Sequence, residues 1–360
     1  MRNSKFKIQN SKFFKFLLVY GFISTFSSCT NESVINSEKT TKENSLTSRP
    51  VNPDPIVEIW ETVVYGVYTE TQNVQPFNQT AKLRIGDNVT TLSTLNSGAN
   101  CVSVSNNLDV YVGGFENTTP YSVQGAKIWK NGLNYFSLPV GSSAVTSIVT
   151  NYEDVYFITG KDIYKNNALL YTLSTTGSAY AGYQCKGISI YVYGADLYAC
   201  GTLSCNAVAV WKNGILTNAF PQTTTNADYL SGSSIYVDNT GVYVAGKLDG
   251  QAKVWKNGNQ INLPTISGST SHADGITGDG TDVYIAGCIN IGGNGGRLWK
   301  MNKANNVVSV QGNYYGARTS VFNYLGEIYT GGWEKIWKNT ELLLYTDTGI
   351  YYNSIFVRNI

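Results

Sequence analysis

The stretch Ala252-Lys253-Val254-Trp255-Lys256-Asn257-Gly258 recurs along the chain in near copies and decides the fold. Within it, apolar and aromatic residues alternate with lysine at a period of two, which is the pattern of a pleated strand. The Asn-Gly pair at its end favours the two positive φ values of a type I′ turn. Each copy therefore predicts a strand that enters a tight hairpin.

The copies recur about every 40 to 45 residues, a period typical of β-propellers. Seven are present, at residues 81–86, 126–132, 162–166, 210–214, 252–258, 297–300 and 335–339. A second segment of the type Asp-Val-Tyr-Val precedes most copies, and further strand-like segments lie on either side, as in Ser234–Val237 and Gln260–Leu263. Four antiparallel strands per repeat make one blade. The sequence thus predicts an all-β fold, a seven-bladed β-propeller of four-stranded antiparallel blades.

Two segments compete to complete the first blade, which begins near Glu61 at its second strand. The last segment, Ser354-Ile355-Phe356-Val357, matches the innermost strand of other blades but has no successor. The alternative is Val57-Glu58-Ile59-Trp60. We favour the C-terminal segment, which would join the two ends of the chain and close the ring.

The N-terminal 28 residues contain five basic residues and no acid, and they include the apolar run Phe16–Ile23. This is the pattern of a secretory signal. Residues 29–55 are polar, with three prolines and no apolar periodicity, and predict a flexible tether with a reach of about 28 Å. Residues 56–360 then form the propeller domain.

Phe26-Ser27-Ser28-Cys29 resembles the lipobox of bacterial lipoproteins, although Phe26 stands where leucine is usual. The resemblance implies that Cys29 becomes the lipidated first residue; simple cleavage near Ser28 is the alternative. With its Trp-Lys-Asn-Gly repeats, the chain resembles a group of Gram-negative bacterial β-propeller lipoproteins of no established activity. This implies a location in the cell envelope, anchored by lipid at the outer membrane, and no catalytic residue.

The strand order sorts the loops onto two faces. The first-to-second turns, such as Asn106-Asn107 and Asp238–Thr240, share one face with the Asn-Gly turns; we call it the tight-turn face. The second-to-third and blade-to-blade loops are longer and share the other, the long-loop face. Binding residues concentrate on such loops of a rigid scaffold.

Tyrosines with polar neighbours gather in these longer loops, at 175–187, 221–232 and 312–320. A tyrosine offers a flat apolar ring and a hydroxyl, which suits a sugar or a protein epitope, but such rings also pack between blades. The predicted ligand-binding residues are Tyr180, Tyr183, Asp228, Tyr229, His272, Tyr314, Tyr315, Arg318 and Trp333. Trp333 lies in a short loop, whereas the repeated tryptophans Trp129, Trp211, Trp255, Trp299 and Trp337 are predicted to pack between blades.

Catalytic and metal-binding patterns are weak. His272 is the single histidine, so any triad must include it, and we interpret it as a loop residue that makes a hydrogen bond. The repeat alignment makes Gly278–Asp282 a turn and not a calcium loop, and it makes the recurring aspartate before the second strand a turn-stabilising acceptor. No catalytic residue, metal site or cofactor is predicted.

Six cysteines are too few for a disulfide framework, and if Cys29 carries lipid the remaining five cannot all pair. A Cys200–Cys205 bridge across a hairpin is one hypothesis, and buried thiols are the other. Without residues 1–28 the net charge falls from +2 to −3, which argues against a nucleic-acid partner. We expect a monomer.

The sequence therefore predicts a non-catalytic envelope protein that binds or scaffolds an extracellular glycan or protein. The alternative is a polysaccharide lyase or glycosidase, for which Asp228 and Asp274 are the pair of carboxylates to test. A purely structural role in an envelope assembly is a third possibility.

Overall fold

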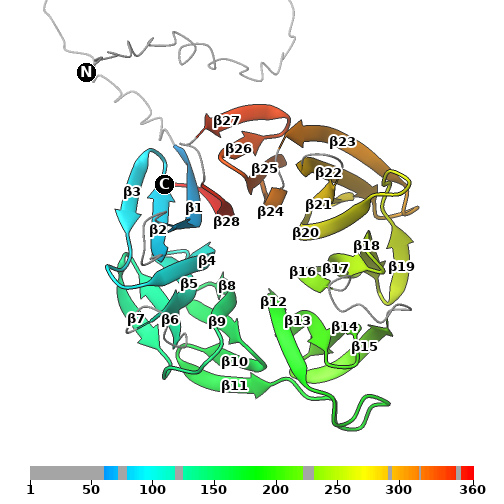
Figure 1. The fold of residues 1–360 in the computed structure, drawn as a ribbon, viewed down its shortest axis with the longest axis horizontal. Helices are drawn as coiled ribbons and strands as arrows, with labels where there is room; N and C mark the ends of the chain where they lie inside the picture. The colour runs from blue at the N-terminus through cyan, green and yellow to red at the C-terminus, as the bar shows by residue number, and fades with distance from the viewer. Residues whose placement is uncertain are drawn as a thin grey trace, which may run out of the picture. The chain divides into compact units, whose positions relative to one another are not determined.

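The computed structural model describes residues 61–71, 79–117, 125–221, 231–290, 294–315, 318–345 and 350–360. These residues form seven four-stranded antiparallel sheets arranged in a ring, a seven-bladed β-propeller (Figure 1). The predicted fold class is confirmed. Among the described residues there is no helix long and apolar enough to cross a membrane.

Each blade runs from an innermost strand at the channel to an outermost strand at the rim. In that order, blade 1 contains β28 (Tyr352–Asn359), β1 (Thr62–Thr71), β2 (Gln79–Ile85) and β3 (Asn88–Thr91); blade 2 contains β4 (Ser97–Val104), β5 (Val110–Glu116), β6 (Gly125–Lys130) and β7 (Leu133–Ser137). Blade 3 contains β8 (Val145–Asn151), β9 (Asp154–Thr159), β10 (Asp162–Lys165) and β11 (Ala168–Thr172); blade 4 contains β12 (Cys185–Tyr193), β13 (Asp196–Leu203), β14 (Ala207–Lys212) and β15 (Ile215–Pro221).

The remaining blades follow the same order. Blade 5 contains β16 (Ser231–Asp238), β17 (Gly241–Leu248), β18 (Gln251–Lys256) and β19 (Asn259–Asn262); blade 6 contains β20 (Thr270–Gly278), β21 (Asp282–Asn290), β22 (Asn294–Asn302) and β23 (Val308–Tyr315). Blade 7 contains β24 (Arg318–Tyr324), β25 (Glu327–Gly332), β26 (Lys335–Lys338) and β27 (Glu341–Tyr345).

The C-terminal strand closes the ring. Strand β28 pairs antiparallel with β1, from Thr62 opposite Asn359 to Tyr68 opposite Tyr352, and forms the innermost strand of blade 1. The preferred closure is therefore confirmed, and the competing segment 57–60 lies outside the described residues. Closure removes the unpaired inner edge that blade 1 would otherwise expose.

The repeated motif has the predicted roles. Its five tryptophans are at most 6% exposed, and each occupies the third strand of its blade. In the turns that follow, Asn131 and Gly132 have φ values of 51° and 81°, and Asn257 and Gly258 have values of 49° and 88°. Positive φ at both central residues is the geometry of a type I′ turn.

A polar cluster ties this turn to the second strand of the same blade. In blade 2 the Asn131 side chain donates to Asp109 over 2.8 Å and accepts from the Val110 N–H over 2.8 Å, while Lys130 pairs with Asp109 at 2.7 Å. Blades 3 and 4 repeat the arrangement at Asp154 and Asp196. The recurring aspartate thus accepts hydrogen bonds at a turn.

The disulfide hypothesis is wrong. All five cysteines in the described residues are free thiols. Cys200 lies opposite Val210 in the β13–β14 ladder, whereas Cys205 lies in the turn beyond its end. A disulfide needs Cα atoms within about 7 Å, which cross-strand partners supply and these two positions do not. The buried-thiol interpretation holds for Cys200, which is fully buried.

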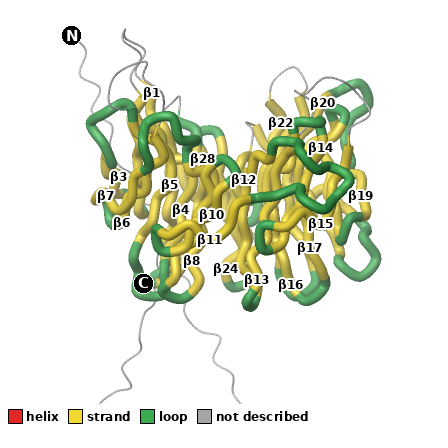
Figure 2. The backbone as a smooth tube through the Cα atoms, turned by 90° about the horizontal axis from the view of Figure 1, so that it is seen from below, coloured by secondary structure: helices red, strands yellow, loops and turns green. Residues whose placement is uncertain are grey.

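The two faces differ as expected. The turns between first and second strands lie at one end of the ring beside the C-terminus, and the longer connections lie at the other end (Figure 2). The connection from β11 to β12 spans residues 173–184, while the turn from β12 to β13 has only residues 194 and 195.

Candidate functional site: the central channel

Every innermost strand carries a register irregularity at the same level. In blade 2 the ladder passes from Ala99 opposite Gly114 to Cys101 opposite Gly113, so Asn100 is the extra residue of a β-bulge. The other six innermost strands have the same break. The seven bulged residues are Asn100, Thr146, Ile188, Ser233, Asp274, Thr319 and Asn353, and we call them the bulge ring.

All seven residues of the bulge ring line one cavity of about 170 Å³ in the central channel. Six of them have polar side chains, and Ile188 is the exception. The residues one position further include Ser147, Ser189 and Ser320, which line the same cavity. The channel therefore presents a band of short polar side chains, contributed by every blade.

Four members of the bulge ring bond to the next blade. The Asn100 amide donates to the Val145 carbonyl over 2.9 Å, and the Asn353 amide donates to the Ala99 carbonyl over 2.8 Å. Thr146 donates to Gly187 over 3.5 Å, and Thr319 donates to the Tyr352 carbonyl. These bonds hold blades together. Because each uses a donor, the capacity left on these side chains is mainly that of an acceptor.

Asp274 differs from these four residues because a carboxylate cannot donate. Its Oδ2 lies 2.6 Å from Nδ1 of His272, and Nε2 of the same ring contacts Sγ of Cys288. Burial lowers the pKa of His272, but the hydrogen bonds and charges of Asp274 and Cys288 outweigh it and raise the pKa to about 10. The imidazole is therefore protonated at neutral pH and donates to both neighbours.

His272 lies in strand β20, so its prediction as a loop residue is wrong. Together, Cys288, His272 and Asp274 have the residue types of a cysteine-nucleophile triad. Their arrangement is reversed, however, because Asp274 faces the channel while Cys288 is only 1% exposed. A histidine held protonated is also a poor general base. The geometry therefore favours a charged structural link behind the channel wall.

Trp333 lies beside this link. Its indole stacks on the Tyr351 ring with centroids 5.9 Å apart and an interplanar angle of 27°, and the two residues form a β-bridge. Burial raises the pKa of Tyr351, and the neighbouring Cys288 and Asp274 raise it further. Tyr351 thus stacks on the predicted residue Trp333 and is close enough to Asp274 and Cys288, the two partners of His272, to be affected by their charges.

Two predicted tyrosines form a separate group. Tyr180 and Tyr183 lie in the connection from β11 of blade 3 to β12 of blade 4, at least two blades away from β20 of blade 6 (Figure 1). The centroids of the two tyrosine rings are 6.4 Å apart. Tyr180 packs against the core of blades 3 and 4, in agreement with the packing interpretation, whereas Tyr183 is 45% exposed. They do not share a site with His272.

The remaining predicted residues are not brought into either group. Tyr314 and Tyr315 lie in strand β23, and Arg318 begins β24, so the predicted loop 312–320 is largely strand and that prediction is wrong. Asp228, Tyr229 and Cys29 lie outside the described residues. The proposed carboxylate pair therefore has Asp274 alone in the described part. In that part no three His, Cys, Asp or Glu side chains are arranged to hold a metal ion.

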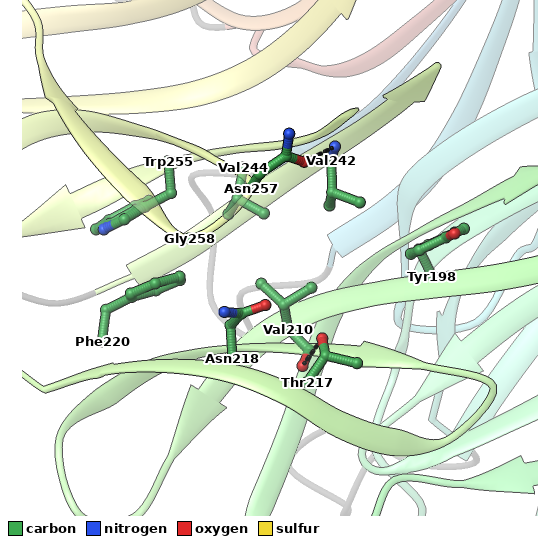
Figure 3. A pocket seen from close by; sticks show the side chains of 10 residues that line it. All are labelled: Tyr198, Val210, Thr217, Asn218, Phe220, Val242, Val244, Trp255, Asn257 and Gly258. Atoms are coloured by element: carbon green, nitrogen blue, oxygen red, sulfur yellow. Dashed lines mark hydrogen bonds between the residues drawn. The ribbon is translucent and has the colours of Figure 1, made fainter. Parts of the chain in front are cut away.

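Sequence reasoning missed a cavity of about 230 Å³ between blades 4 and 5 (Figure 3). Phe220 stacks on Trp255 there with centroids 5.2 Å apart and an angle of 14°. Polar groups on its wall are engaged: Asn257 accepts from the Val242 N–H, and Thr217 donates to Val210 (Figure 3). We interpret this cavity as a gap in the packing between blades.

The fold defines the class of this protein, which is a seven-bladed β-propeller. No model of a known protein family matches the chain, and no curated protein sequence matches it. Solved structures match in fold alone. The computationally designed Ika8 protein is 14% identical, with 80% of this chain and 89% of that chain covered and a TM-score of 0.47.

Two natural propellers are similar to the same degree. U3-55K is 14% identical, covering 73% of this chain and 86% of its own, with a TM-score of 0.49. The Pan2 WD40 domain of Neurospora crassa is 8% identical, covering 70% and 80%, with a TM-score of 0.46. At this level of similarity, neither their sites nor their partners transfer to this chain.

Proposed function

We propose that this chain is an exported, lipid-anchored, non-catalytic binding module of the cell envelope, and that it takes an extracellular glycan at the long-loop mouth of its channel. The observation that carries the proposal is the bulge ring, whose unused hydrogen-bonding capacity is mainly that of acceptors. Sugar hydroxyls can donate to such acceptors. The stacked pair Trp333 and Tyr351 beside the mouth supplies the apolar face on which a sugar ring packs.

The test is binding of the protein to a glycan array, with three variants at the two candidate positions. Trp333→Ala removes the stacking surface, Trp333→Phe keeps an aromatic face, and Tyr183→Ala alters the competing loop of blades 3 and 4. We expect the wild type to bind a glycan on the array. Trp333→Ala should weaken the affinity for this glycan about tenfold, Trp333→Phe should largely retain it, and Tyr183→Ala should leave it unchanged.

The opposite pattern, with loss only in Tyr183→Ala, would move the site to the 173–184 connection. The absence of any glycan hit would favour a protein ligand and contradict the glycan proposal. Mass spectrometry of each bound glycan separates binding from cleavage, since shortened products would support the lyase or glycosidase alternative.

Lipid anchoring is tested independently of the ligand. In cells that make the full chain, Cys29→Ala should move the protein from the membrane fraction to the soluble fraction, and the wild-type N-terminal peptide should carry a lipid mass at Cys29. An unmodified Cys29 in membrane-bound protein would contradict the anchor and leave the glycan proposal standing.

A further inference from the structure

Three turns on the tight-turn face carry large apolar side chains in a backbone conformation that disfavours them. Leu108, Tyr152 and Leu325 have φ values of 65°, 55° and 52° and are 45%, 75% and 78% exposed. Left-handed backbone is usual for glycine, asparagine and aspartate, because a branched or bulky side chain crowds the main chain there. The turn geometry thus does not explain these residues, and neither does burial.

The three turns belong to neighbouring blades. Leu325 is in blade 7, Leu108 in blade 2 and Tyr152 in blade 3, and blade 1 between them ends at Ile360, which is 46% exposed. We call Leu325, Ile360, Leu108 and Tyr152 the apolar arc. It runs around the tight-turn mouth of the channel.

Hydrogen bonds between these blades hold the arc together. The Asn107 amide donates to Glu153 over 2.5 Å and joins the turns of blades 2 and 3. Arg358 donates to the Ser105 carbonyl, and the Asn359 N–H donates to the Tyr324 hydroxyl over 3.0 Å. The arc is therefore one continuous surface whose neighbouring charged side chains, Glu153 and Arg358, already have hydrogen-bond partners.

The first-to-second turns of blades 5 and 6 are polar. There Lys303 donates to the Asp238 carboxylate and to the Asp279 carbonyl, and it is only 5% exposed. The first-to-second turns of these blades contain Asn239, Thr240 and Gly280 in place of large apolar residues. Among the described first-to-second turns, large apolar side chains at positive φ are therefore confined to blades 7, 2 and 3 and are not a general property of the repeat.

The chain enters the propeller beside the arc. The Ile360 N–H donates to the Glu61 carbonyl over 3.0 Å, so the described part of the chain begins on the tight-turn face next to the arc. The predicted lipid site at Cys29 is 32 residues before Glu61. The tether predicted for residues 29–55 would reach about 28 Å, so the proposed anchor would hold the arc near the bilayer.

We propose that the apolar arc lies on the lipid bilayer, with Leu325, Leu108 and Tyr152 entering the headgroup region and the long-loop mouth facing away. This rests on the proposed export and anchoring through Cys29. Two exposed leucine side chains and an amphipathic tyrosine suit the interface between headgroups and acyl chains. Since Glu153 and Arg358 beside the arc already have hydrogen-bond partners, the docking is argued from the apolar side chains and does not require anionic lipid.

The test uses vesicles and the chain from residue 30, which lacks the lipid site but holds the whole ring, closed on itself within residues 61–360. Vesicles of phosphatidylcholine and phosphatidylethanolamine are floated with the wild type and with the triple variant Leu108→Asn, Tyr152→Asn, Leu325→Asn. Asparagine suits positive φ, so the triple variant should fold with an equal or higher melting temperature. The control is Val140→Asn with Ile266→Asn, both exposed on the long-loop face.

We expect the wild type and the control to float with the vesicles, the triple variant to bind at least about tenfold more weakly, and added phosphatidylglycerol to change little. Equal binding by the triple variant would overturn the proposal, as would binding that appears only with anionic lipid. The wild type could instead fail to bind vesicles and self-associate through the arc, which sedimentation would detect. That result would make the arc an interface between copies of the chain and overturn the lipid proposal. None of these outcomes bears on the Cys29 modification, which is measured separately.

Discussion

Blades 2 and 6 use the same bulge in the channel for different purposes. In blade 2 Asn100 donates across the blade interface to Val145, a neutral bond that ties two blades together. In blade 6 the Asp274 carboxylate bonds to His272 instead, and the histidine ring contacts Cys288 within the same blade. The bulge is common to both blades. The residue type at the bulge determines whether its side chain bonds to the next blade, as Asn100 does, or carries a charge, as Asp274 does.

The largest effect is expected at Asp274. Asp274→Ala leaves the protonated His272 without its acceptor, and losing a charged, mostly buried hydrogen bond costs about 2–3 kcal/mol. The free energy of unfolding in urea at pH 7 measures this loss. A loss no larger than that of Asn100→Ala would contradict the distinction between the two blades.

The second effect is a pH dependence confined to blade 6. The pKa of His272 is raised from its ordinary value of 6.5 to about 10 in the folded protein. Its contribution to stability is therefore fully present below about pH 6.5 and is lost as pH rises through 10. We expect the stability difference between wild type and His272→Gln, from melting temperatures, to shrink over that window. A difference that is constant from pH 6 to 10 would show that the imidazole is neutral.

A smaller effect is expected for the neutral bonds between blades. Asn353→Ala removes the bond to Ala99 and should cost about 1 kcal/mol, as is typical of a neutral hydrogen bond. Urea unfolding provides the measurement, with Ile188→Ala as the comparison because Ile188 occupies the same bulge without a donor. Equal losses would mean that packing, and not the hydrogen bond, holds the blades at this level.

The smallest effect is expected on the tight-turn face. Lys130 pairs with Asp109 at 2.7 Å, but both side chains are partly exposed, at 34% and 26%. Lys130→Ala should therefore cost no more than about 0.5 kcal/mol at physiological salt. If thermal unfolding shows a loss comparable to that of Asp274→Ala, the repeated polar clusters contribute more than surface ion pairs usually do.

The pairing of His272 with Cys288 depends on a bulge that the sequence does not mark. The turn at 279–281 fixes how β20 and β21 pair, and counting back from it without a bulge sets Ala273 opposite Cys288. The bulge at Asp274 shifts the register by one residue and brings His272 opposite Cys288 instead. A bulge at the same level in all seven blades leaves no clear composition signal, because Asn, Thr, Ile, Ser and Asp all occupy it. The link was therefore not predictable from alternation alone.

The sequence by itself determined the blades, their number, the ring closure by residues 354–357 and the burial of the repeated tryptophans. These follow from short-range rules: a period of two along each strand, Asn-Gly at the turns, and a repeat that must bury its faces against its neighbours. Only the tertiary structure decided which side chains meet in the channel and which turn tips lie side by side around its mouth. Such contacts depend on bulges and on the closure of the ring. These bring together residues that are far apart in the chain and produce no periodic pattern in the sequence.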